Sequence, residues 1–174
     1  MKIRQEFYEK GKISDTPFGV ITLFHVLEHI YTPKILLKNL IEDNLKESGI
    51  FVIEVPNFES LQSKIAAAKW LHLDIPRHIN HFKFDILKKM IEDIGGRIIK
   101  VEYYHTVHGI LGMVSSLLNV LGYSKNIMSE LKYRRTVLLI FMIVVTLPVA
   151  TLFEIIASLL KKGAVLRIYA TINK

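Results

Sequence analysis

Short apolar runs alternate with helix-like stretches along the first part of the chain. Residues 19–24 and 50–55 are rich in apolar and β-branched side chains, which predicts strands buried in a parallel sheet. Between them, leucine and isoleucine recur at helical spacing through residues 33–46, after a typical helix start at Thr32 and Pro33. A strand, a helix and a strand in this order predict a parallel crossover.

The pattern continues beyond residue 80 with a second helix and two more strands. Residues 84–94 have the spacing of an amphipathic helix, and the glycine pair Gly95-Gly96 indicates where it ends before a strand. Residues 164–172 have strand character. The chain is therefore predicted to be an α/β protein.

Two long apolar segments lie between the last two predicted strands. Residues 109–121 predict an apolar helix, and the 18 residues 136–153 contain no charged side chain, which is the lower limit for a membrane-spanning helix. Pro148 would either kink one helix or divide the run into two short helices. We expect membrane contact here, and the alternative is a helix pair packed on the sheet or covering an oligomer interface.

Composition narrows the classes of partner. The 174 residues carry a net charge of +7, but the basic side chains are spread along the chain and cluster only beside the apolar segment, which favours a membrane boundary over a nucleic-acid interface. There is no cysteine and no apolar stretch in residues 1–10. These features predict a cytoplasmic protein with membrane association through residues 136–160.

Polar, titratable residues follow the predicted strands directly. His25, Glu28 and His29 come after the first strand, Asn57 follows the second, and a histidine-rich stretch occupies residues 75–82. Open α/β sheets bind their ligands at the carboxyl ends of strands. These residues therefore mark the expected functional site.

Four features in this order carry a resemblance to a known family. ITLFHVLEH at 21–29, SGIFVIEVPN at 48–57, Trp70 and LDIPRHINHF at 73–82 together resemble the C-terminal part of class I S-adenosylmethionine-dependent methyltransferases, in the branch with HVLEH and PRHxxHF motifs. The resemblance implies a partial Rossmann-like sheet at 1–104, an apolar helical insertion at 105–163 and the final strand at 164–174. It implies S-adenosylmethionine as the cofactor, with Leu23, Phe24 and His25 beside its methionine part.

The family's cofactor loop is missing from this sequence. Members bind the cofactor through a glycine-rich loop after their first strand and an acidic residue after their second, and this chain has neither. Gly19 also stands where relatives usually have an aspartate. We therefore expect a truncated or split methyltransferase whose N-terminal half was lost or is encoded separately, and a catalytically inactive membrane-associated fragment or interaction module is the alternative.

The histidines and Glu28 are the catalytic candidates. His25, Glu28 and His29 have the i, i+3, i+4 spacing that would place them on one helical face. We expect His29 to position the acceptor or to remove its proton, and the alternative is that it only bonds loop backbone. The candidates are His29, His25, Glu28, His78 and His81.

Three further residues are candidates for the acceptor site. Asn57 follows the second strand, Trp70 could form a wall of the pocket, and Arg77 could hold an anionic acceptor or pair with Asp74. An apolar insertion over this site favours a hydrophobic or lipid-linked acceptor.

A metal-dependent chemistry remains an alternative. Some methyltransferases bind a divalent cation through an ExxEH pattern; here His25 takes the place of the first glutamate, and His78 and His81 could add ligands if their loop folds over the site. His25-x-x-Glu28-His29 is also the pattern of a class of zinc proteases. The protease motif needs a longer helix than this sequence allows between a strand and Thr32. We assign no metal ligand from the sequence.

Overall fold

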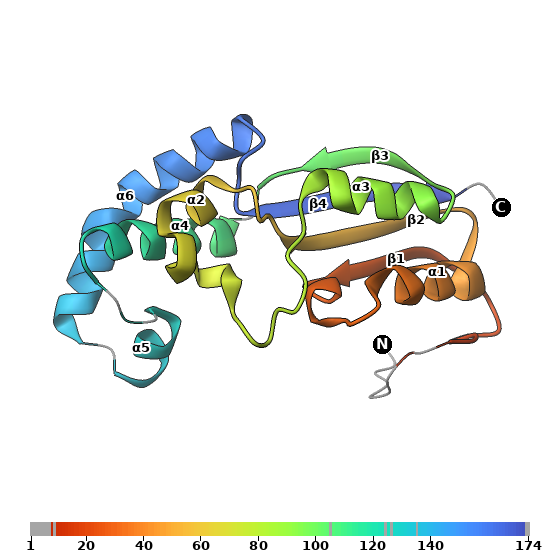
Figure 1. Ribbon diagram of the computed structural model, residues 1–174, viewed down its shortest axis with the longest axis horizontal. Coiled ribbons are helices and arrows are strands. Elements are labelled where there is room, and N and C mark those ends of the chain that lie inside the picture. Colours follow the sequence, from red (N-terminus) through yellow and green to blue (C-terminus); the bar gives the residue numbers. More distant parts are fainter. Residues whose placement is uncertain are drawn as a thin grey trace.

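A four-stranded mixed sheet forms one half of the protein (Figure 1). The computed structural model describes residues 8, 10–104, 106–123, 125, 127–134 and 136–172. The strand order is β1-β2-β4-β3. The strands are β1 (Phe18–Phe24), β2 (Leu45–Pro56), β3 (Gly96–Glu102) and β4 (Val165–Ile172).

The predicted parallel crossover is present at the start of the chain. Strands β1 and β2 pair in parallel, with Leu23 opposite Ile53, and α1 (Pro33–Asn44) connects them. The helix ends before residue 46 and β2 begins earlier than predicted, because Leu45 is buried and pairs with Phe18. Strand β4 then runs antiparallel between β2 and β3.

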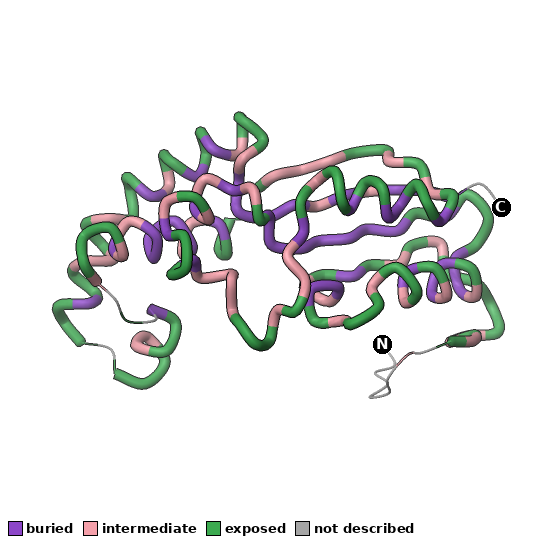
Figure 2. Tube along the Cα trace, in the orientation of Figure 1, coloured by how far each residue is buried: buried purple, intermediate pink, exposed green. Residues whose placement is uncertain are grey.

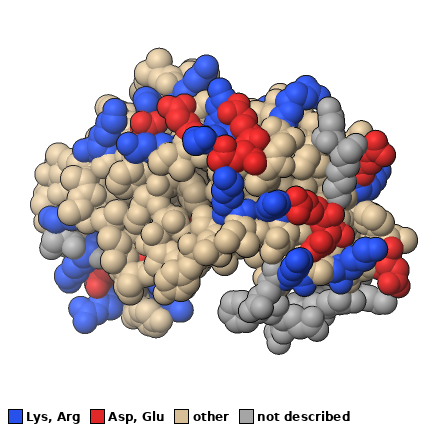
Figure 3. Space-filling model, turned by 45° about the vertical axis from the view of Figure 1, so that its right-hand side comes forward, with Lys and Arg blue, Asp and Glu red and all other residues tan. Residues whose placement is uncertain are grey.

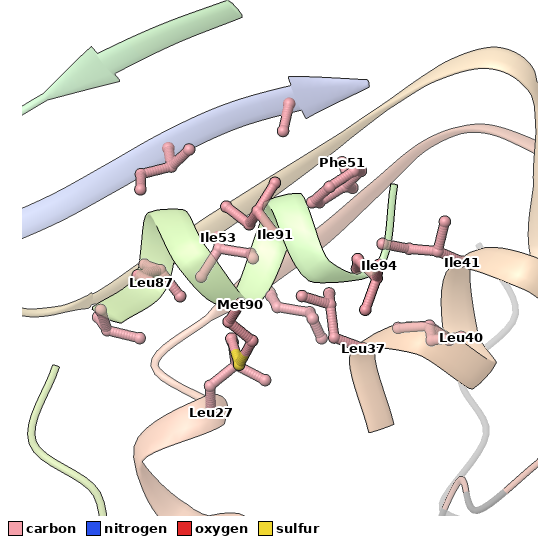
Figure 4. Close-up of a cluster of buried hydrophobic side chains, with 14 of the residues drawn as sticks. Leu27, Leu37, Leu40, Ile41, Phe51, Ile53, Leu87, Met90, Ile91 and Ile94 are labelled. Carbon is pink, nitrogen blue, oxygen red and sulfur yellow. The ribbon is translucent and has the colours of Figure 1, made fainter. Parts of the chain in front are cut away.

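Helices α1 and α3 (Phe84–Asp93) cover one face of the sheet (Figure 1). Their apolar sides meet strand residues in one buried cluster, part of which is drawn in Figure 4. Gly95 takes a left-handed φ of 80° immediately after α3, as the glycine pair predicts. The cluster includes Leu37, Leu40, Ile41, Phe51, Ile53, Leu87, Met90, Ile91, Leu166 and Ile168.

Strand β1 is left open at the edge of the sheet. Among the described residues it pairs only with β2, and Val20 and Phe24 are 58% and 49% exposed. The contrast between the buried central strands and the more exposed β1 is visible in Figure 2. An apolar edge strand with free backbone groups is a template for pairing with another chain.

Helices form the other half of the protein (Figure 1). This half contains α2 (Leu61–Ala66), α4 (Thr106–Val120), α5 (Ile127–Tyr133) and α6 (Val137–Leu159), and α4 packs against both α2 and α6. The last three helices lie between β3 and β4 in the chain, in the stretch expected as an insertion. Short 3₁₀ turns at Leu27–His29 (η1), Ala67–Lys69 and Leu71–Leu73 complete the described elements.

Helix α6 is continuous through Pro148, so the apolar run forms one helix and not two. It is the one helix of the described chain that is long and apolar enough to cross a membrane, and only 17% of its most apolar window is buried. The alternative of a buried helix pair is therefore wrong in part: α6 packs on α4 along one side and leaves most of its surface exposed.

The packed side of α6 carries one buried carboxylate, Glu154. Its Oε1 accepts a hydrogen bond of 2.8 Å from the Ala164 N–H, and its Oε2 accepts one of 2.7 Å from the Gln62 side chain. Gln62 also donates to the carbonyl of Gly109 in α4. Glu154 thus ties α6 to α2 and to the start of β4.

Candidate functional site

The expected site residues follow the carboxyl ends of β1 and β2. His25 comes directly after β1 with a left-handed φ of 53°, and its N–H donates to the carbonyl of Glu54 in β2. Asn57 follows β2, as predicted. Because β1 and β2 are parallel, these ends meet at the same edge of the sheet.

His25 lies between two buried carboxylates. Its Nδ1 is 3.1 Å from Glu28 Oε1 and its Nε2 is 3.2 Å from Glu54 Oε1. Glu54 also pairs with Arg167 of β4. The hydrogen bond to Glu28, and to a smaller extent the one to Glu54, raises the pKa of His25 to about 9. The ring of His25 is therefore a cation at neutral pH.

This raised pKa predicts that stability falls at alkaline pH. The folded pKa lies above the unfolded value, so the stabilisation is complete below about pH 6.5 and is lost as the pH rises through 9. The ring is 26% exposed, and we expect a loss on the order of 2 kcal/mol in the free energy of unfolding between pH 6 and pH 9.5. Urea unfolding of the parent chain and of His25→Gln measures it, and an equally steep loss in the variant would contradict this origin.

A second group of side chains forms on the other side of Glu28. His29 and His78 meet with their ring centroids 4.8 Å apart. The loop that carries His78 is fixed to η1, because the N–H groups of Ile79 and Asn80 both donate to the carbonyl of Glu28. The expectation of a single helical face is wrong: His25 precedes the turn in a left-handed conformation and points to the carboxylates, whereas His29 points to His78.

His25 and His78 line a cleft of about 410 Å³ between the two halves of the protein. It contains two histidines that the sequence did not single out, His72 and His108, and the ring of His108 lies 5.0 Å from that of His25. Burial lowers the pKa of His72 to about 4, so its ring is neutral. The lining residues are His25, Leu71, His72, Asp74, Arg77, His78, His108, Leu111, Met128 and Ser129.

Of the three residues predicted for the acceptor site, Asn57 and Trp70 lie outside the lining of the cleft and Arg77 belongs to it. Asn57 is buried and bonds the Gly163 carbonyl and the Glu59 N–H. Trp70 is buried beside Phe58, with an indole N–H that has no partner among the described residues. Arg77 borders the cleft and pairs with Asp74, one of the two expected alternatives.

The three residues expected beside the cofactor, Leu23, Phe24 and His25, do not share one surface. Leu23 packs into the core under α1, so it does not line the cleft. Phe24 is exposed on the open face of the sheet, under the guanidinium of Arg167. His81 bonds the carbonyl of Leu73 and lies against Phe58.

Three residues of the site, Glu54, His72 and His108, were not predicted from the sequence, and only Glu54 stands in a recognisable sequence pattern. Glu54 interrupts the apolar β2 run, and a carboxylate at such a position indicates a buried partner. His72 and His108 had no such pattern, because they reach the cleft from the 3₁₀ turn Leu71–Leu73 and from α4, which are distant in sequence. Their position depends on the packing of the helical half.

The geometry does not support the protease pattern. Both ring nitrogens of His25 face carboxylates, so His25 cannot also bind zinc beside His29. The cleft instead combines the cationic imidazole of His25 with the neutral imidazole of His72. Such a set can orient an acceptor and exchange protons with it.

Known sequences and solved structures identify the family and the fold to which this chain is similar. The sequence profile of a family described as a methyltransferase domain matches residues 2–101, more than half of the chain. No curated protein matches the sequence. A solved structure of a candidate methyltransferase from Bacillus halodurans is 13% identical, with a TM-score of 0.51 over 93% of this chain and 67% of that chain. It confirms the expected α/β fold.

Two other solved structures are more distant in fold. A SAM-dependent methyltransferase from Archaeoglobus fulgidus is 21% identical, with a TM-score of 0.49 over 90% of this chain and 60% of that chain. Phosphoethanolamine N-methyltransferase 2 from Haemonchus contortus, solved with S-adenosyl-L-methionine, is 12% identical with a TM-score of 0.46, over 90% and 34% of the two chains. The chain thus spans less than two thirds of the length of either protein.

Proposed function

The chain belongs to the methyltransferase domain family, and we propose that it forms the acceptor-binding part of an S-adenosylmethionine-dependent methyltransferase. The observation that supports this most directly is the histidine-lined cleft beside the carboxyl ends of β1 and β2, within and next to the residues that match the family. In this proposal the imidazoles of His25, His72 and His108, which line the cleft, contact the acceptor.

The described residues fit only one side of the proposed cofactor. Phe24 offers an exposed apolar surface and His25 a cationic ring, but Leu23 is buried in the core. The glycine pair Gly95-Gly96 lies at the junction of α3 and β3, away from this edge. The chain on its own is therefore expected to bind the cofactor weakly, and no step of methyl transfer is assigned to it alone.

We propose that the open edge of β1 pairs with a further part of the methyltransferase domain. The edge is apolar, and none of the seven residues of β1 is charged or a proline, the features that usually protect an edge strand. A strand added there in parallel would bring its own carboxyl end next to His25. This is the position from which a partner could complete the cofactor site.

We also propose a hydrophobic or lipid-linked acceptor. The exposed side of α6 is apolar along its whole length, and Lys161 and Lys162 follow its C-terminal end. Figure 3 shows a broad area of the surface without charged side chains. A helix with such a face lies in the boundary of a lipid bilayer, and anionic lipids attract lysines beside it.

Calorimetric titration with S-adenosylhomocysteine tests the proposal. The purified chain is titrated alone and together with the polypeptide encoded immediately upstream of it. We expect heat of binding only with the upstream polypeptide, and Phe24→Asp is expected to weaken this binding at least tenfold. Ile86→Asp, an equal change at an exposed site of α3 away from the edge, is the matched control. Absence of binding in both titrations would overturn the proposal.

A further inference from the structure

Three side chains beside the cleft have the composition of a metal site. One ligand atom each from Glu28, His29 and His78 lies within 4.8 Å of the other two. The first two come from the turn after β1, and His78 comes from the loop at residues 75–82. Hydrogen bonds from Ile79 and Asn80 to the Glu28 carbonyl fix this loop on the turn, so the three residues are held together by backbone.

Both imidazoles are oriented in the manner of metal ligands. His29 Nδ1 lies 2.9 Å from the carbonyl oxygen of Arg77, and His78 Nδ1 lies 2.8 Å from that of His72. A carbonyl oxygen only accepts, so each Nδ1 carries the proton. In the neutral form of each ring the lone pair is then on Nε2, and such a bond to a backbone carbonyl typically orients a histidine that binds metal. Nε2 of His78 also lies 4.0 Å from Asp74 Oδ2.

Glu28 has an unexplained buried atom. The residue is 1% exposed, and its Oε1 is held by His25. Its Oε2 is buried and has no hydrogen-bond partner among the described residues. A buried carboxylate oxygen without a partner costs free energy, and a cation at this position would remove that cost.

We propose that Glu28, His29 and His78 bind one divalent transition-metal ion. Two imidazoles and one carboxylate suit zinc, iron(II), cobalt(II) or nickel(II) and not magnesium or calcium, which prefer oxygen ligands. An ion with bonds of about 2.1 Å requires the donor atoms to move closer together, and the exposed ring of His29 has the freedom to do so.

This ligand set differs from the ExxEH pattern of cation-binding methyltransferases and from the HxxEH pattern of zinc proteases. His25 takes the first position of HxxEH but supports Glu28 instead of binding the ion, and His78 replaces it from a distant loop. Three protein ligands leave coordination positions of the ion free, and His78 places the proposed site at the border of the cleft. Water or an oxygen atom of a bound acceptor would occupy them.

Titration with cobalt(II) chloride, followed by visible absorption, tests the site on the whole chain after chelator treatment. We expect one ion per chain, competition by zinc chloride, and binding at least tenfold weaker in His29→Ala and His78→Ala. Glu28→Gln keeps the size of the side chain and is expected to weaken binding similarly. Circular dichroism establishes that each variant is folded, and exposed His29 is the position least able to disturb the fold.

His81→Gln is the matched control. His81 belongs to the same loop, but its Nε2 bonds the carbonyl of Leu73 and it is not one of the three proposed ligands. We expect it to bind cobalt as the parent does. Equal binding by the parent and by His29→Ala would overturn the site, as would a parent that binds no ion. This test measures binding alone, so its outcome is independent of the proposed methyl transfer.

Discussion

Replacing Leu138, Phe141 and Val145 together by aspartate is expected to abolish binding of the chain to phospholipid vesicles. These residues are 66%, 63% and 56% exposed and lie on one side of α6. Burying each apolar side chain in lipid contributes about 1.5–3 kcal/mol, so we expect a loss of at least roughly 5 kcal/mol, more than a thousandfold in the partition coefficient. Vesicle sedimentation with anionic lipids measures it.

A matched triple variant separates this effect from added charge. Tyr31, Ile35 and Ile86 are also exposed apolar residues, but they lie on the sheet half. Their replacement by aspartate adds the same three charges and is expected to leave vesicle binding unchanged. If the α6 variant still sediments with vesicles as the parent does, α6 is not the lipid-binding surface. The exposed apolar side of α6 would then be available for a protein partner.

Removing the Glu154 carboxylate is expected to loosen the helical half. Glu154→Ala leaves the buried Ala164 N–H and one bond of the Gln62 amide without a partner. Two such losses cost about 3 kcal/mol, so amide hydrogen exchange in α4 and α6 is expected to accelerate about a hundredfold. Exchange in β2 and α3 should change little, because these elements belong to the separate core cluster.

Glu154→Gln is the informative control for this variant. A glutamine can still accept from the Ala164 N–H, but its own amide meets that of Gln62, so we expect a smaller acceleration than for alanine. Equal exchange rates in the parent and in Glu154→Ala would show that α6 is held to α4 by apolar packing alone. The result therefore decides whether hydrogen bonds of Glu154 or apolar packing alone hold α6 in the position that leaves its apolar side exposed.

The individual elements of the sheet followed from local patterns. The apolar runs at β1 and β2, the helix start at Thr32-Pro33 and the glycine pair after α3 each act through a few neighbouring residues. Boundaries were less accurate, because Leu45 joins β2 through burial and pairing with Phe18, which are distant contacts. The apolar run at 136–153 predicted a helix but not whether Pro148 would divide it.

The sequence by itself determined the fold class, the methyltransferase family and the chemistry available after β1, because short motifs and hydrophobic periodicity encode these locally. Tertiary structure alone decided how that chemistry is arranged. Glu28 and the buried Glu54 of β2 together make His25 a cation, and the docking of the 75–82 loop places His78 beside His29. Burial and pairing depend on segments far apart in the chain, and no local pattern records which of them will meet.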